Sequence, residues 1–169
     1  MIERYQYLEI EKIWNDQNKF DTWKLVEQKY LETLEENNIS PSGVAKVIEK
    51  TEVLKDEVYE REKITNHDLA SFLDILQSKV GDNSNWIHYG LTSSDVVDTA
   101  NSLLIKQSLS ITIELLDELL KQIEAKAKQE MHTLIVGRTH GVFAETTFLG
   151  NIFGNWHQEI KRNRERLEN

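Results

Sequence analysis

The sequence has no cysteine, a single proline and only seven glycines among its 169 residues. Without cysteine, neither a disulfide framework nor a thiolate metal site can form, which is usual in the reducing cytoplasm. Because proline and glycine are the residues that most often interrupt helices, their scarcity favours long helices. No apolar run reaches the roughly 18 residues of a membrane-spanning helix, and the start lacks the pattern of a signal peptide. We therefore expect a cytoplasmic chain that is rich in helices.

Basic side chains are fewer than acidic ones, at 20 against 29, and the net charge is −9. A nucleic-acid-binding protein needs a basic face that displaces counterions from phosphates. The most basic stretch, Lys161–Arg166, is interrupted by Glu165, which is typical of a solvated helix face. We expect no nucleic-acid partner and no membrane partner. An acidic protein can still bind an anionic small molecule where a few cationic groups and backbone amides converge.

Apolar residues recur at steps of three or four through most of the chain, which predicts helices. The predicted helices cover residues 10–15, 20–37, 41–50, 56–62, 66–80, 95–130 and 145–169. Ser40 followed by Pro41 is typical of a helix start, and Gly81 is typical of a helix end. The run Leu134–Val136 is β-like in composition but too short to found a sheet. These patterns predict an all-α fold.

The longest predicted helix, over residues 95–130, would span roughly 54 Å at 1.5 Å per residue. Its broad apolar stripe requires several partner helices. We expect a small N-terminal helical domain, residues 1–90, followed by the first part of a long-helix bundle domain, residues 91–169. The last helix meets no stop signal before Asn169. Either the chain is the front portion of a longer protein, or this helix frays at a natural end.

Two polar clusters stand at predicted helix starts. Thr92–Asp95 offers four capping residues where one is enough, at a position where free N–H groups and the helix dipole favour anions. The surplus hydroxyls either help to hold a carboxylate or phosphate, or are redundant caps. In the second cluster, Asn66 or Asp68 can cap the helix over residues 66–80, and His67 can lie at the surface.

His140 lies between small, turn-forming residues in the segment Gly137–Gly141. The glycines allow a close approach of backbone to a ligand, and histidine titrates near neutrality, which suits a proton donor or acceptor. Such a histidine can equally be a solvated loop residue, and His132 and His157 have no motif around them. The sequence contains no metal-binding spacing and no glycine-rich phosphate or dinucleotide motif. We therefore expect neither a metal nor an organic cofactor.

Four segments occur in a characteristic order. They are Met1–Tyr5, Asn66–Phe72, Trp86–Ala100, and Gly137–Gly141 with Ala144–Glu145. In this order they resemble the adenylosuccinate lyase family of the fumarase/aspartase superfamily, over essentially the whole chain. The resemblance implies a small helical domain joined to a bundle of very long helices, and a homotetramer. It also implies a lyase of purine biosynthesis that releases fumarate and AMP from adenylosuccinate, or fumarate from the succinyl-aminoimidazole-carboxamide nucleotide.

The resemblance implies two catalytic histidines. His140 matches the family's general acid, which protonates the leaving nitrogen, and His67 matches a second histidine beside the substrate, oriented through Asp68. The family's catalytic base is a serine on a mobile loop rich in glycine and serine, and this sequence has no such loop. Family active sites also combine residues from three subunits. The chain alone should therefore be incomplete and inactive.

The resemblance also implies a set of substrate-binding residues. They are Arg4, Tyr5, Asn66, His67, Asp68, His88, Thr92 and Ser93. Arg4 and Tyr5 match contacts to the nucleotide phosphate, for which a guanidinium fork is suited. Thr92 and Ser93 match contacts to the succinyl portion. His88 lies near that segment, and a structural role for it stays open.

Two positions depart from the family pattern. Relatives usually carry proline at the position of Thr146, and close relatives often carry histidine at the position of Phe143. The first departure leaves the entry geometry of the last helix open. Two alternatives follow: argininosuccinate lyase or another fumarate-releasing member of the superfamily, and a helical assembly module that kept the fold without the chemistry.

Overall fold

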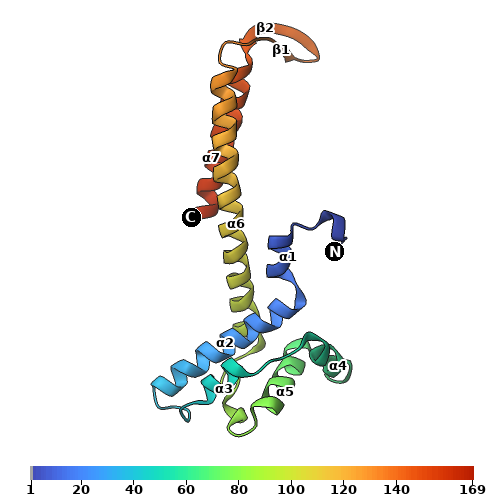
Figure 1. Ribbon diagram of the computed structural model, residues 1–169, viewed down its shortest axis with the longest axis vertical. Helices are drawn as coiled ribbons and strands as arrows, with labels where there is room; N and C mark the ends of the chain where they lie inside the picture. Colours follow the sequence, from blue (N-terminus) through green and yellow to red (C-terminus); the bar gives the residue numbers. More distant parts are fainter. Residues whose placement is uncertain (1) are drawn as a thin grey trace. The chain divides into compact units, whose positions relative to one another are not determined.

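The computed structural model describes residues 2–169, so Met1 of the N-terminal motif lies outside the described residues. The chain divides into two compact units, Met1–Ser108 and Leu109–Asn169, and helix α6 (Ser93–Gln129) contributes to both (Figure 1). The fold is helical as predicted, with one two-stranded sheet. Within residues 2–169, no helix has both the length and the apolar character needed to cross a membrane. The predicted boundary near Gly90, between the helical domain and the long-helix bundle domain, stays a prediction.

The first unit is built from short and medium helices that pack around one core. Its elements before α6 are η1 (Glu3–Tyr5), α1 (Leu8–Trp14), α2 (Asp16–Glu36), α3 (Val44–Lys50), α4 (Lys55–Thr65), α5 (Asp68–Val80) and η2 (Ser84–Trp86). Aromatic rings form the centre of the core. The Phe20 and Trp23 rings meet edge to face at 5.3 Å, and Trp23 meets Phe72 in the same way at 5.6 Å. All three side chains are buried, so they contribute large apolar areas and favourable ring geometry.

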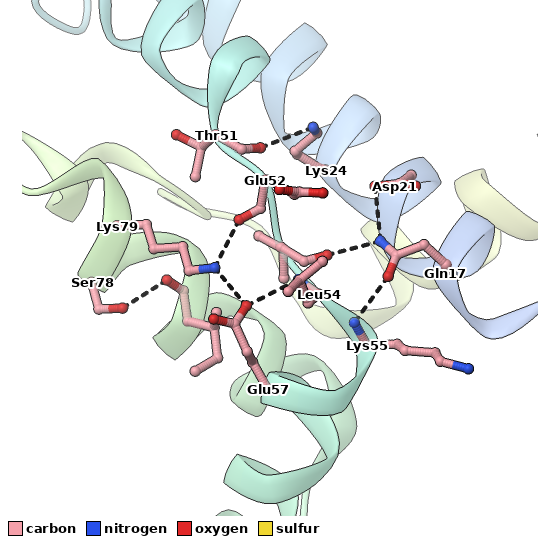
Figure 2. Close-up of polar contacts among 12 residues, drawn as sticks. Gln17, Asp21, Lys24, Thr51, Glu52, Leu54, Lys55, Glu57, Ser78 and Lys79 are labelled. Atoms are coloured by element: carbon pink, nitrogen blue, oxygen red, sulfur yellow. Dashed lines mark hydrogen bonds and ion pairs between the residues drawn. The ribbon is translucent and has the colours of Figure 1, made fainter.

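The connection between α3 and α4, Thr51–Leu54, is held by side chains from two other helices (Figure 2). Three of its carbonyls accept hydrogen bonds: Thr51 from Lys24 Nζ at 3.0 Å, Glu52 from Lys79 Nζ at 2.9 Å, and Val53 from Gln17 Nε2 at 2.8 Å. Lys79 also forms an ion pair with Glu57 in the first turn of α4. Because α2 and α5 provide these donors, they fix where α4 begins.

The second unit contains the rest of α6, the strands β1 (Leu134–Thr139) and β2 (Val142–Phe148), and α7 (Leu149–Glu168). Figure 1 shows α7 running beside α6, with the hairpin beyond the end of the helix pair. The Arg164 guanidinium joins Asp117 across the two helices through Nε and Nη2. Gly150 allows their closest approach, since a Cβ there would lie 2.7 Å from the carbonyl oxygen of Ala127.

The hairpin corrects the prediction that Leu134–Val136 is too short to found a sheet. The strands pair antiparallel from Leu134 with Phe148 to Thr139 with Val142. The two residues between them, His140 and Gly141, have φ of 52° and 78°, which a two-residue hairpin turn of type I′ requires. Residues 145–148, predicted as helix, instead form the end of β2. Pairing across the turn therefore decided the structure of both segments.

Helix α3 also begins later than predicted, at Val44 instead of Pro41. Ser40 is not its N-cap, and the buried Ser40 Oγ has no hydrogen-bond partner among residues 2–169. The Glu35 carboxylate on α2 satisfies the helix start instead, accepting from Gly43 N at 3.0 Å and Ala45 N at 2.7 Å. A carboxylate is favoured there because the first N–H groups of a helix are unpaired.

Candidate active site

The predicted site residues lie at helix ends, in the segment before α6, and at the hairpin turn. Backbone groups at such places are available to ligands because regular hydrogen bonding stops there. His140 belongs to the second unit, and every other predicted site residue belongs to the first. Among residues 2–169, no group of three or more histidine or carboxylate side chains is placed to hold a metal ion.

His67 is the N-cap residue of α5. Its ring Nδ1 accepts a hydrogen bond from the backbone N–H of Ala70 at 3.3 Å, and its carbonyl accepts one from Ser71 Oγ at 2.8 Å. Because Nδ1 acts as an acceptor, the neutral ring carries its proton on Nε2. About half of the side chain, 51%, is exposed. The ring is thus fixed on one side and open on the other.

The two neighbours of His67 do not cap the helix, contrary to the sequence-based interpretation. Asp68 Oδ1 accepts from its adjacent backbone N–H, that of Leu69, at 2.7 Å and lies 3.5 Å from His67 Nδ1. The Ala70 N–H holds the ring by a hydrogen bond, and the Asp68 carboxylate lies beside the same ring nitrogen. Asn66 closes α4 with a left-handed backbone at φ 53°, a conformation that asparagine tolerates better than most residues. That sharp turn places Asn66, His67 and Asp68 together at the junction between the end of α4 and the start of α5.

At the start of α6, one of the four polar residues forms a capping contact. The Asp95 carboxylate accepts from Thr92 N at 2.8 Å. Thr92 is exposed and Ser93 is partly exposed. Neither hydroxyl forms a hydrogen bond with another residue in the described part of the chain. This bond is the Asp95 half of a capping box, and the two hydroxyls remain available at a helix terminus that attracts anions.

His88 forms the most buried polar contact of the site. Its ring Nδ1 lies 2.6 Å from Glu27 Oε1, and its backbone N–H donates to Glu27 Oε2 at 2.9 Å. The Glu27 side chain is 1% exposed, and the His88 side chain is 18% exposed. Burial raises the pKa of Glu27, against the opposing effect of the hydrogen bonds from His88.

Sequence reasoning missed Glu27, although a signal was present. Glu27 stands four residues from both Trp23 and Leu31, on the face of α2 that enters the core. A carboxylate at a core position is rarely left unpaired, because an isolated buried charge is very unfavourable. The position alone therefore indicated that Glu27 has a partner, without identifying that partner.

His140 is exposed at the hairpin turn, as a proton donor that meets a ligand requires. Beside it, the Arg138 guanidinium lies 5.7 Å from the centre of the Phe143 ring. Phe143, one of the two departures from the family pattern, is 78% exposed. The turn thus carries an imidazole, a cation and an uncovered aromatic ring.

Arg4 and Tyr5 lie in η1, and the Arg4 guanidinium is 4.9 Å from the centre of the Tyr5 ring. Tyr5 is 70% exposed. It borders a cavity of about 240 Å³ that Tyr7, Ile10 and Trp14 also line. An exposed guanidinium beside an open cavity can reach an anionic group.

Comparisons with known proteins identify the family to which the chain is similar. A family described as lyase matches residues 8–169. The chain is 41% identical over 169 residues to the adenylosuccinate lyases of Bacillus subtilis (strain 168) and of Streptococcus mutans serotype c. In each case the match covers 99% of this chain and 39% of the relative, so the chain spans about two fifths of their length.

Solved structures share the fold at lower identity. Fumarate lyase from Mesorhizobium sp. BNC1 gives a TM-score of 0.88 at 20% identity, over 94% of this chain and 38% of that one. The β-carboxy-cis,cis-muconate cycloisomerase of Acinetobacter calcoaceticus gives 0.88 at 20% identity, over 96% and 40%. At this identity the likeness concerns the fold.

Proposed function

The chain belongs to the lyase family that matches residues 8–169, and we propose that it is the N-terminal portion of an adenylosuccinate lyase. The whole enzyme cleaves the C–N bond of adenylosuccinate to give AMP and fumarate, and treats the succinyl-aminoimidazole-carboxamide nucleotide of purine biosynthesis likewise. The identity of 41% to two enzymes of that name, over the full length of this chain, is the observation that carries the proposal.

The reaction is a β-elimination. A base removes a proton from the carbon beside a carboxylate, and the electron pair is delocalised into that carboxylate. The pair then forms the double bond of fumarate while the C–N bond breaks, and the leaving nitrogen takes up a proton. The extra negative charge on the carboxylate requires fixed donors. The free hydroxyls of Thr92 and Ser93, at the positive end of a 37-residue helix, support that role.

His140 is the proposed general acid that protonates the leaving nitrogen. Its exposure at a two-residue turn supports this role, because the ring has no neighbour that would keep it from a substrate. His67 is the second proposed catalytic residue. Its fixed Nδ1 leaves Nε2 as the nitrogen that donates to the substrate in the neutral ring.

The remaining residues are proposed to bind substrate. Arg4 and Tyr5 contact the nucleotide phosphate, as their exposure beside a cavity supports. Asn66 and Asp68, the two neighbours of His67, are proposed to bind substrate beside it. His88 provides a partly exposed ring close to the start of α6.

The proposed enzyme is a homotetramer of the cytoplasm, with a helical domain over residues 1–90 and a bundle domain from residue 91. Exposed apolar side chains in the second unit support assembly, since Leu115, Leu119 and Trp156 are 46%, 44% and 50% exposed. Residues 1–169 alone are expected to be inactive, because the catalytic serine loop is not among them. Light scattering of the full-length protein tests the tetramer.

Fumarate release by the full-length protein tests the proposed reaction. We expect turnover of adenylosuccinate and none of argininosuccinate. His140→Ala should lower kcat by about 100-fold or more, because general acid–base steps contribute 100- to 10,000-fold. His132→Ala is the matched control, an exposed histidine of the same unit outside the proposed site. Turnover of argininosuccinate instead would favour the alternative lyase, and turnover of neither would favour an assembly module.

A further inference from the structure

Glu27 occupies a position in the core of the first unit where an apolar residue would be expected. Among the residues whose exposure the structure describes, it is the only charged one that is buried. Removing a carboxylate from water costs several kcal/mol, and a single partner rarely compensates for it fully. Since stability alone does not favour a buried carboxylate, its presence suggests that the partner residue has a function that requires it.

Both oxygens of that carboxylate bind one residue, His88, which lies 61 positions away in the sequence. One oxygen accepts the backbone N–H and the other meets ring Nδ1. The His88 backbone is left-handed, at φ 64°, which is uncommon for a residue other than glycine. The first bond, to the backbone N–H, ties this turn to α2. The second bond, to the ring, fixes the imidazole and determines which nitrogen is free.

We propose that Glu27 is a positioning residue of the lyase site, which holds His88 by Nδ1 and so presents Nε2 to an anionic oxygen of the substrate. This rests on the proposed function, in which His88 is a substrate-binding residue. A carboxylate partner favours the proton on Nδ1, and a second proton, on Nε2, makes the ring an imidazolium. The imidazolium then donates from Nε2.

The segment that follows His88 leads to a helix start that favours an anion. Helix α6 begins five residues later, at Ser93, and its first turn carries the free hydroxyls described above. The His88 side chain keeps 18% of its surface exposed, so the ring is not sealed in the core. The chemistry expected of the ligand group is a carboxylate or a phosphate oxygen.

The first test reads the ring directly and needs no activity. Solid-state ¹⁵N NMR on the full-length protein, labelled at the histidine imidazoles, assigns His88 by comparison with His88→Gln. We expect the Nδ1 of His88 to be protonated and bound to Glu27. In Glu27→Gln, the amide oxygen should accept the backbone N–H and the amide nitrogen should donate to Nδ1, which moves the ring proton to Nε2. A wild-type ring with a bare Nδ1, or identical signals in the variant, would overturn the proposal.

The second test measures fumarate release. Glu27→Gln should raise the KM for adenylosuccinate about 10-fold or more, the lower range for losing a residue that orients a functional histidine. In the His88→Gln background the same change should have no further effect on KM, because Glu27 acts through that ring.

Glu35→Gln is the matched control. Glu35 lies on the same helix, and its carboxylate also binds two groups. Both are backbone N–H groups, those of Gly43 and Ala45, and neither belongs to a histidine. It should lower thermal stability without changing the KM or the His88 signals. If Glu27→Gln also changes only stability, Glu27 is merely structural. If the wild-type protein releases no fumarate, the proposed reaction fails, while the NMR result still decides whether Glu27 sets the His88 ring.

Discussion

The two units differ in where their apolar side chains are. The first has a buried aromatic centre, with Phe20 and Phe72 fully buried. The buried residues of α6 all lie before residue 109, and Gly150 is the single buried residue of α7. A similar apolar periodicity thus produced a core in one unit and an exposed stripe in the other. Periodicity predicts that a helix has an apolar face, but it does not predict what covers that face.

Removing an aromatic ring should change the free energy of unfolding very differently in the two units. Phe72→Ala should lower the free energy of unfolding by about 3–5 kcal/mol, because it leaves a cavity among packed rings. Phe143→Ala, at a side chain that is 78% exposed, should change it by less than about 0.5 kcal/mol. Urea denaturation of both variants measures the difference. Equal losses would show that Phe143 is covered in solution and that the comparison is wrong.

The second unit should be sensitive at the tight contact between Gly150 and the backbone of α6. Gly150→Ala places a Cβ 2.7 Å from a carbonyl oxygen of α6, so the helices must separate, at about 1–3 kcal/mol. Gly154→Ala, where no atom lies within 4 Å, should instead stabilise α7 by about 0.5–1 kcal/mol. Thermal unfolding followed by circular dichroism compares them. Two stabilising changes would indicate that α6 and α7 do not pack at Gly150.

The hairpin turn should respond to backbone conformation rather than to packing. Gly141 has φ 78° with no atom near its missing Cβ, so Gly141→Ala should cost about 1–2 kcal/mol from the left-handed backbone alone. Gly141→Asn should cost less, since asparagine tolerates this region. Hydrogen exchange of the β1 and β2 amides reports the opening of the hairpin. Faster exchange in the asparagine variant than in the alanine variant would contradict this account.

The smallest expected effect is at the surface of the first unit. Lys79, and then the Leu54 N–H, lower the pKa of Glu57 below its ordinary value of 4.5. The stabilisation is therefore present above about pH 4.5 and is lost as the pH falls through the lowered pKa. Glu57→Gln should reduce stability by less than about 1 kcal/mol at neutral pH, since the pair is partly exposed. The difference from wild type should vanish in acid, as urea titrations at several pH values would show, and an unchanged difference would exclude the ion pair as its source.

The sequence predicted those elements whose signals are local. Helix α6 begins within two residues of its predicted start, because a capping residue and an unbroken apolar stripe coincide there. Two other boundaries depend on groups distant in the sequence. The start of α3 is set by Glu35 on the preceding helix, and β2 exists because it pairs with β1. Single-residue patterns carry no information on such partners.

The candidate site shows the same division. The polar clusters at residues 66–68 and 92–95 could be identified from composition alone. The backbone geometry was needed to show that the His67 ring caps α5 through Nδ1. Only that contact shows which ring nitrogen is free. The partner of His88 was hidden because Glu27 is 61 residues away, on a helix interpreted only for its apolar face.

The way the connection Thr51–Leu54 is held has a consequence for how this region can vary. Side chains of α2 and α5 bind its backbone carbonyls. Every residue type offers the same backbone carbonyl as an acceptor. Replacement of the exposed Glu52 should therefore be tolerated, whereas replacement of Lys24 or Lys79 should not. The connection is therefore specified by donors on the neighbouring helices together with the buried side chain of Val53.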